Sequence, residues 1–491
     1  MEKLLDWFKE NIFLVLVGFI LFFVPLYPKF PLWFISEASV AVRLEDFLVA
    51  FTIGFWGYSK LKRGKIKEWA SRFTTKLFLL YFFIGFLSFL SSVLITKNVI
   101  TKVAFLHFLR RIEYLMVFFV AYDSLKKVKQ VGIYAASLAV ATFGVLVYAV
   151  GQKFFSWPVV STMNQEFAKG TFLRLSVWAR VNSTFAGHYD LAAFLAMILV
   201  LSVSGLVIVK GKLLKLLIFL FWLFCLYVLI LTSSRISFPA YLIAIVILLV
   251  RLKRYLLIPF FVIVSLLGML LSTEFSQRYQ STFKISPKYL SYFSGMVKVK
   301  PKEVVPTAIL SPIPTEIPLP TVFVTVRPKV ILPTATITPT PTSTPTPLPV
   351  AVEEPVEPTE LAVSRSTDIR LKVEWPRAIR AFAKNPFLGT GYSSITLATD
   401  NDYLRMLGET GILGTLSFAL ILIEIFRKGL KFIRKQKTGI EYSLVVAIMC
   451  ASFAYLLNAT FIDVFEASKL AYIFWIMMGI ALKIVDLESS K

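Results

Sequence analysis

The chain has 491 residues, of which 57% are hydrophobic and 46 are phenylalanine. Its mean hydropathy of +0.73 excludes an ordinary water-soluble domain and predicts a protein embedded in a bilayer. The formal net charge of +24 does not indicate a nucleic-acid partner, because the basic residues are dispersed among loops between apolar segments.

Apolar segments long enough to cross a bilayer recur along the chain. A helix rises about 1.5 Å per residue, so roughly 17–25 residues span the hydrocarbon core. We therefore predict an all-α polytopic membrane protein with about twelve transmembrane helices, since a helix satisfies its own backbone in lipid. The predicted spans are 12–28, 44–59, 76–96, 108–124, 130–150, 189–209, 213–231, 237–252, 255–272, 410–427, 442–459 and 468–484.

Basic residues recur at every second loop, which sets the predicted orientation. Short loops rich in Lys and Arg stay in the cytoplasm. The apolar N-terminal segment lacks a small-residue cleavage site and is expected to be a retained span. Both termini are therefore predicted to be cytoplasmic in a bacterial inner membrane. The basic runs are KLKRGKIKEW from Lys60, SLKKVK from Ser124, KGKLLK from Lys210, RLKR from Arg251 and RKGLKFIRKQK from Arg427.

The apolar pattern divides the chain into three parts. Residues 1–272 form a predicted bundle of nine helices, 273–409 a long extracytoplasmic loop, and 410–491 the last three helices. Within the loop, about 301–363 is rich in Pro and Thr, which favours an extended or disordered spacer over a packed core. The spacer is either a tolerated insertion, which we favour, or a functional segment, namely a stalk that reaches into the cell wall or a surface for O-glycosylation.

The sequence contains no recognisable metal or cofactor motif. Cys225 and Cys450 both lie in predicted spans and suggest neither a disulfide nor a metal site. No phosphate-binding glycine loop, HExxH or EF-hand pattern occurs, so we expect no metal and no cofactor.

Polar residues gather on the predicted outer face. The loop before the sixth span carries WARVNSTFAGHYD, the seventh-to-eighth hairpin carries LTSSRISFPA, and the end of the long loop, about 366–409, contains EWPRAIRAFAKNPFLGTGYSS and TDNDYLRMLGETGILG. Topology places all of these in one compartment. The outer-face residues are Arg180, His188, Arg235, Arg370, Lys372, Glu374, Arg377, Arg380, Asp400, Asn401 and Asp402.

These motifs, in this order, resemble the O-antigen ligase and O-antigen polymerase superfamily, which includes bacterial O-oligosaccharyltransferases. The resemblance covers most of the chain, including the long outer loop between the ninth and tenth spans. RVNSTFAGHYDLAAFLA is similar to the family's Arg-x-x-Gly-Thr-Phe segment, and TSSRISF to its Ser-Arg hairpin. The two motifs of the long loop are similar to its Trp, Pro-Leu-Gly-x-Gly and His-Asn-x-Tyr-Leu elements.

The resemblance implies a metal-independent transferase that moves a glycan from a polyprenyl-diphosphate carrier to an acceptor hydroxyl at the outer face, with inversion at the anomeric carbon. The partners would be this donor, a glycan, lipid or protein acceptor, and membrane lipids. Arg180 and Arg235 would hold the diphosphate, because planar guanidinium groups bind phosphate oxygens in pairs and stabilise a leaving anion.

The acceptor hydroxyl also needs a base within hydrogen-bond reach. Where the family places a histidine this chain has Asp400, which we predict to be the base, although nearby arginines should lower its pKa. Asp402 is a substitute and His188 a more distant one.

Further site residues follow from the same resemblance. Asn401, Arg370 and Arg377 would orient the loop or the sugars, while Gly389 and Gly391 are candidates for substrate contact.

Each of these residues also has a structural interpretation. Arg180 and Arg235 could snorkel at helix ends, and Asp400 or Asn401 could cap the helix that enters the tenth span. The glycines and Pro386 would then only shape a turn. Trp375 is expected to pack rather than to stack on a sugar, and His107 to be structural.

Two other functions remain open. A transporter or flippase of lipid-linked sugars would explain the spans, but we find no internal repeat and few acidic residues in the spans. The second alternative function is that of a membrane anchor that displays the Pro/Thr stalk. We favour the transferase because polar motifs cluster beside the long outer loop.

Overall fold

The structure is a computed structural model. It describes residues 6–8, 10–34, 41–161, 172–175, 179–273, 275–280, 282, 366–395 and 398–490. The predicted spacer at 301–363 lies outside these residues.

The described chain is built almost entirely of helices. Two two-residue strands, β1 (Trp33–Phe34) and β2 (Ala41–Val42), pair antiparallel with Trp33 opposite Val42. The helices are α2 (Ile12–Leu26), α3 (Leu44–Lys62), α4 (Ile66–Ser71), α5 (Phe73–Ser91) with the π-helical turn Ser92–Thr96, α6 (Thr101–Ser124), the 3-10 turn Val128–Gln130, α7 (Val131–Phe154), α8 (His188–Ile208), α9 (Lys212–Leu231), α10 (Ser237–Arg251), α11 (Leu257–Leu271), the π-helical turn Arg370–Glu374, α14 (Trp375–Lys384), α15 (Asp402–Lys435), α16 (Ile440–Asn458) and α17 (Ser468–Ser489).

Each predicted span coincides with one of these helices. In the described part of the chain, 7 helices are long and apolar enough to cross a membrane, and α2, α10 and α11 are shorter apolar helices. The expectation of a multi-pass, all-α membrane protein is therefore confirmed. The count of about twelve crossings and the place of the long loop stay predictions.

The core of the bundle surrounds α17, which packs on α6 and α16, while α8 packs on α9 and α16. In the most apolar stretch of α17, 83% of the residues are buried, because both faces of this helix carry large apolar side chains. The Trp475 ring lies 5.6 Å from Phe78 and 5.9 Å from Phe418. Such ring contacts supply the dispersion energy that holds helices together where lipid is as apolar as the protein.

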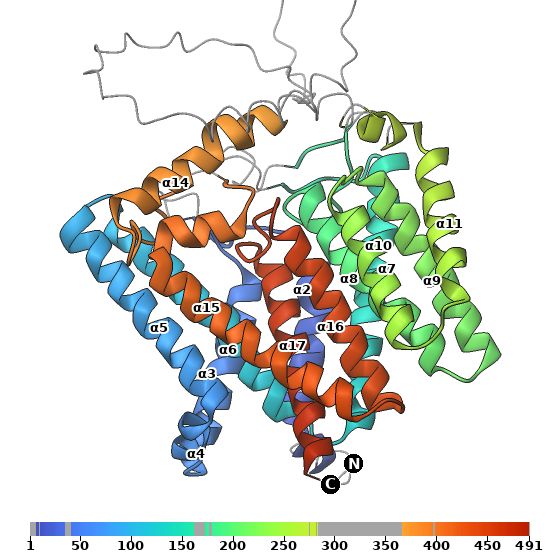
Figure 1. Cartoon of the computed structure of the whole chain (residues 1–491), viewed down its shortest axis with the longest axis horizontal. Coiled ribbons are helices and arrows are strands. Elements are labelled where there is room, and N and C mark those ends of the chain that lie inside the picture. The colour runs from blue at the N-terminus through green and yellow to red at the C-terminus, as the bar shows by residue number, and fades with distance from the viewer. Residues whose placement is uncertain are drawn as a thin grey trace, which may run out of the picture.

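The two ends of the bundle differ. Both termini lie at one end, and α14 lies across the opposite end, with α15 descending from it through the bundle (Figure 1). The placement of both termini in the cytoplasm stays a prediction. The residues of the predicted site lie in loops or helix ends near α14.

Candidate functional site

The loop before α8 is fixed to its neighbours by buried hydrogen bonds. The Ser183 amide donates to Gln152 Oε1 at 2.8 Å, and the Ser183 hydroxyl donates to the carbonyl of Val145 at 2.7 Å. The Thr184 hydroxyl donates to the carbonyl of Pro25 at 2.6 Å. These bonds attach the loop to α7 and α2, so the arginine that precedes it has a defined position.

Arg180 lies beside the first turn of α8. Its Nη1 is 2.5 Å from His188 Nε2 and 3.4 Å from the Tyr189 hydroxyl. A guanidinium can only donate, so Nε2 of His188 accepts and carries no proton. Folding thus brings His188 into contact with Arg180, and its assignment as a more distant substitute for the base stays a prediction.

Tyr189 lies between two guanidinium groups. Its ring centroid is 5.8 Å from Cζ of Arg180 and 5.7 Å from Cζ of Arg370. A cation near an aromatic face is attracted to the ring quadrupole. Tyr189 thus holds two cations from separate segments near each other.

Arg235 comes from the hairpin between α9 and α10. Its Nη1 donates to Thr282 Oγ1 at 2.6 Å, and its carbonyl accepts from the Tyr279 hydroxyl at 2.8 Å. Burial lowers the pKa of Arg235, and repulsion by Arg370 and Arg180 lowers it further, while Tyr189 opposes both. Arg180, Arg235 and Arg370 therefore share one electrostatic environment, which we call the arginine cluster.

Asp400 is paired with the arginine cluster. Oδ2 of Asp400 lies 2.6 Å from Nη2 and 2.9 Å from Nε of Arg370. Burial raises the pKa of Asp400; Arg370 opposes this and Asp463 adds to it. The expectation that arginines lower the pKa of Asp400 is wrong, because loss of hydration outweighs the attraction of Arg370.

Asp463 fixes the backbone around Asp400. Its Oδ2 accepts from the Thr399 amide at 2.8 Å, and its Oδ1 accepts from the Asn401 amide at 3.1 Å. Asp400, between these amides, has a φ of +49°, which is costly for a residue with a side chain. Asp463 also binds Nη1 of Arg405 at 3.0 Å. The aspartate thus holds Asp400 in a conformation that it would otherwise leave.

The next two residues have structural contacts. Asn401 caps α15, because its side-chain oxygen accepts from the Leu404 amide at 3.0 Å. Asp402 is 3% exposed and its Oδ2 accepts from the Phe465 amide at 3.0 Å. The described geometry gives both residues roles in the start of α15.

Helix α14 and the π-helical turn before it carry two more polar groups, Arg377 and Glu374. Nη1 of Arg377 is buried and has no hydrogen-bond partner among the described residues. Burial, followed by repulsion from Asp400, raises the pKa of Glu374 to about 7, against the effect of Arg370 and Arg377. The Trp375 ring lies 6.0 Å from Phe461, in agreement with the packing interpretation.

Gly389 and Gly391 lock the Pro-Phe-Leu-Gly-Thr-Gly turn onto α15. The Gly391 amide donates to the carbonyl of Glu409 at 2.8 Å. Gly389 has a φ of +68°, and a Cβ there would lie 2.4 Å from the same carbonyl oxygen. Helix α15 is itself kinked at Gly411, which has a φ of +64°. These contacts support the turn interpretation of both glycines.

Sequence reasoning missed the acidic residues of the hairpin before α17. Glu466 pairs with Arg111 and lies 3.8 Å from Nε of Arg405. Although burial opposes it, the attraction of Arg111 and Arg405 lowers the pKa of Glu466 to about 2. The one available signal was the pair of acidic residues in TFIDVFEAS, which topology places on the same side as the motifs.

Comparison with known proteins identifies one family. Residues 219–419 match the family model described as O-antigen ligase. The match covers Arg235, Arg370 and Asp400, whereas Arg180 and Asp463 lie outside it. It confirms the resemblance to the O-antigen ligase and O-antigen polymerase superfamily. No curated protein matches the chain.

Proposed function

We propose that this protein, a member of the O-antigen ligase and O-antigen polymerase superfamily, transfers a glycan from a polyprenyl-diphosphate carrier to an acceptor hydroxyl at the outer face of the cytoplasmic membrane. The observation that carries the proposal is the meeting of the arginine cluster with Asp400. These residues come from three segments that are far apart in the sequence.

Arg180 and Arg235 would bind the diphosphate of the donor. Tyr189 holds the guanidinium of Arg180 beside that of Arg370. In a cleft with little water, fixed cations stabilise negative charge on a leaving group more strongly than water does. The bond between the anomeric carbon and the diphosphate oxygen would break, and polyprenyl diphosphate would leave with both electrons of that bond.

Asp400 would accept the proton of the acceptor hydroxyl as its oxygen attacks the anomeric carbon. The carboxylate side chain is 25% exposed, so one side remains open to a substrate. Burial raises its pKa, which makes it a stronger base than an ordinary aspartate. Arg370 would hold the carboxylate in place.

Arg377 is the residue of the predicted site best suited to the sugars. Its Nη1 is buried without a partner in the described chain, and such a donor is costly unless a ligand or water satisfies it. A sugar hydroxyl or an oxygen of the diphosphate would accept the hydrogen bond from Nη1 of Arg377. Gly389, Gly391, Asn401 and Asp402 would instead support the site through the backbone.

The test places the purified full chain in liposomes with polyprenyl-diphosphate oligosaccharides and an acceptor fraction. Release of polyprenyl diphosphate should depend on the acceptor and fall by roughly 10²–10³-fold in Arg235→Ala, the range for loss of one charge-stabilising donor. Arg254→Ala is the matched control. Movement of the intact lipid across the bilayer without release would favour the transporter instead.

A further inference from the structure

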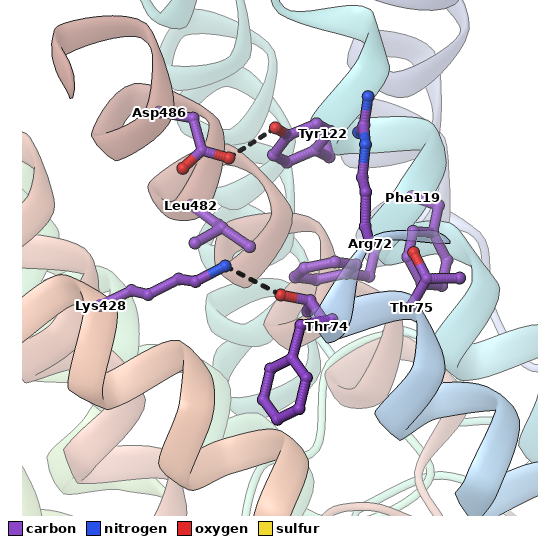
Figure 2. A pocket seen from close by; sticks show the side chains of 10 residues that line it. Arg72, Thr74, Thr75, Phe119, Tyr122, Lys428, Leu482 and Asp486 are labelled. Atoms are coloured by element: carbon purple, nitrogen blue, oxygen red, sulfur yellow. Dashed lines mark hydrogen bonds between the residues drawn. The ribbon is translucent and has the colours of Figure 1, made fainter. Parts of the chain in front are cut away.

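A polar cavity lies at the end of the bundle where the termini are. It has a volume of about 350 Å³, and Arg72, Lys428 and Asp486 line it together with Thr75, Phe119 and Leu482. Figure 2 shows Arg72 and Thr75 on one side of the cavity, facing Lys428 and Asp486. None of these residues belongs to the proposed transfer site.

The position of the cavity along its helices corresponds to the depth expected for lipid head groups. It is formed by the beginning of α5 and the last turns of α6 and α17. Both α5 and α17 are apolar enough to cross the membrane, so their ends mark the border of the hydrocarbon core. Phosphate groups of lipids lie at this border.

One wall of the cavity is suited to an anion. Arg72 is the N-cap residue of α5, and no side chain caps this helix. The first amides of a helix lack intrahelical partners and carry partial positive charge. The Arg72 guanidinium lies 5.3 Å from the Tyr122 ring and also binds Glu68 at 2.8 Å. It is therefore held beside the cavity.

A buried hydroxyl is a second, independent observation that indicates a ligand. Thr75 lines the cavity, is 1% exposed, and its Oγ1 has no hydrogen-bond partner among the described residues. A buried hydroxyl without a partner is destabilising, because it has lost its hydration without gaining a hydrogen bond. An acceptor oxygen within the cavity would remove that cost.

The opposite wall adds a second cation and a carboxylate. Lys428 Nζ donates to Thr74 Oγ1 at 3.1 Å and lies 3.4 Å from Oε1 of Glu424. The Tyr122 hydroxyl donates to Asp486 Oδ2 at 2.5 Å. The carboxylate of Asp486 retains acceptor capacity for a cation.

We propose that this cavity binds a membrane phospholipid whose head group carries an amine beside its phosphate. The phosphate contacts the α5 N-terminus, Arg72, Lys428 and the Thr75 hydroxyl. The amine contacts Asp486, and the lipid chains lie along the apolar surface that includes the exposed ring of Phe73. The lipid links α5, α15 and α17 at the end of the bundle away from the transfer site.

Native mass spectrometry of the full-length protein, purified with phosphatidylethanolamine, phosphatidylglycerol or inorganic phosphate, tests the proposal. We expect retained phosphatidylethanolamine to fall at least about tenfold in Arg72→Gln/Lys428→Gln, since the variant removes two charge-assisted contacts to the phosphate. The matched control is Lys67→Gln/Lys431→Gln, which removes two exposed cations, one from α4 just before Arg72 and one from α15, and should retain the lipid.

Thr75→Val separates binding from folding. Valine fills the same space without the hydroxyl, so it should raise the melting temperature of lipid-free protein and lower phosphatidylethanolamine retention. Equal retention in wild type and both lining variants would overturn the proposal, as would displacement of the bound anion by inorganic phosphate with no phospholipid retained. Equal retention of phosphatidylglycerol and phosphatidylethanolamine would overturn the assignment of Asp486 to the amine.

Discussion

Removing the carboxylate of Asp463 should reduce transfer through its effect on Asp400. Asp463→Ala deletes the acceptors for the Thr399 and Asn401 amides, at 2.8 and 3.1 Å. Asp400 then loses the bonds that hold its φ at +49°. Aspartate adopts the left-handed region more readily than most residues, but still less readily than ordinary negative φ, so the freed backbone should relax toward negative φ.

The size of the effect follows from how strictly a base must be placed. Displacement of a reacting group by about 1 Å can cost about 10²-fold in rate, so we expect kcat to fall by about that factor. The KM for the donor should change little, because Arg180 and Arg235 do not contact Asp463 in the described geometry. Loss of the bond to Arg405 should lower the free energy of unfolding by about 1–3 kcal/mol.

A double-mutant cycle distinguishes positioning from general destabilisation. The assay is acceptor-dependent release of polyprenyl diphosphate from liposomes by Asp463→Ala, Asp400→Asn and the double variant. If Asp463 acts through Asp400, the double variant should be as slow as Asp400→Asn. Asp123→Asn, at the other end of the bundle, is the control. An additional 10²-fold loss in the double variant would refute the reasoning.

Three further outcomes are expected. Burial raises the pKa of Asp400, and its carboxylate is the base form, so the transfer rate should rise as the pH passes upward through this pKa. Arg370 lowers the pKa of Asp400, so Arg370→Gln should move the rise in rate to higher pH. A pH–rate profile unchanged in Asp400→Asn would contradict this. Gly389→Ala should lower the free energy of unfolding by about 2–4 kcal/mol, because the new Cβ adds left-handed strain and a clash with the backbone. Gly54→Ala is the control, since a Cβ at this position would meet no atom within 4 Å and should not destabilise the protein. Thermal unfolding of the two variants measures the difference. Deleting 301–363 should preserve transfer if the chain is an enzyme, and an inactive deletion variant that still folds would favour the anchor.

Helix positions were predictable because a bilayer imposes a length and an apolar composition on every crossing segment. The predicted tenth span at 410–427 nevertheless missed the first turns of α15, which begins at Asp402. Those turns carry Arg405 and Glu409, and their helical structure depends on the cap at Asn401. Hydropathy alone does not detect a polar helical extension of this kind.

The site was predictable only in part, since topology gathers residues on one face without giving their contacts. Arg180, Arg235, Arg370 and Asp400 were selected from motifs. Asp463 was not, because a single aspartate in a short hairpin has no pattern of its own. The contacts of Asp463 depend on the packing that brings the hairpin before α17 beside the start of α15.

The failed expectation for the pKa of Asp400 has a physical cause that also affects its proposed function. An arginine beside an exposed aspartate would lower its pKa, and from the sequence only that neighbour is visible. Folding removes water from the carboxylate, and this loss is the largest influence on its pKa. The Arg370 pair then limits the rise instead of reversing it. A carboxylate in this balance accepts a proton more readily than an exposed one, which is what the proposed role of Asp400 as the base requires.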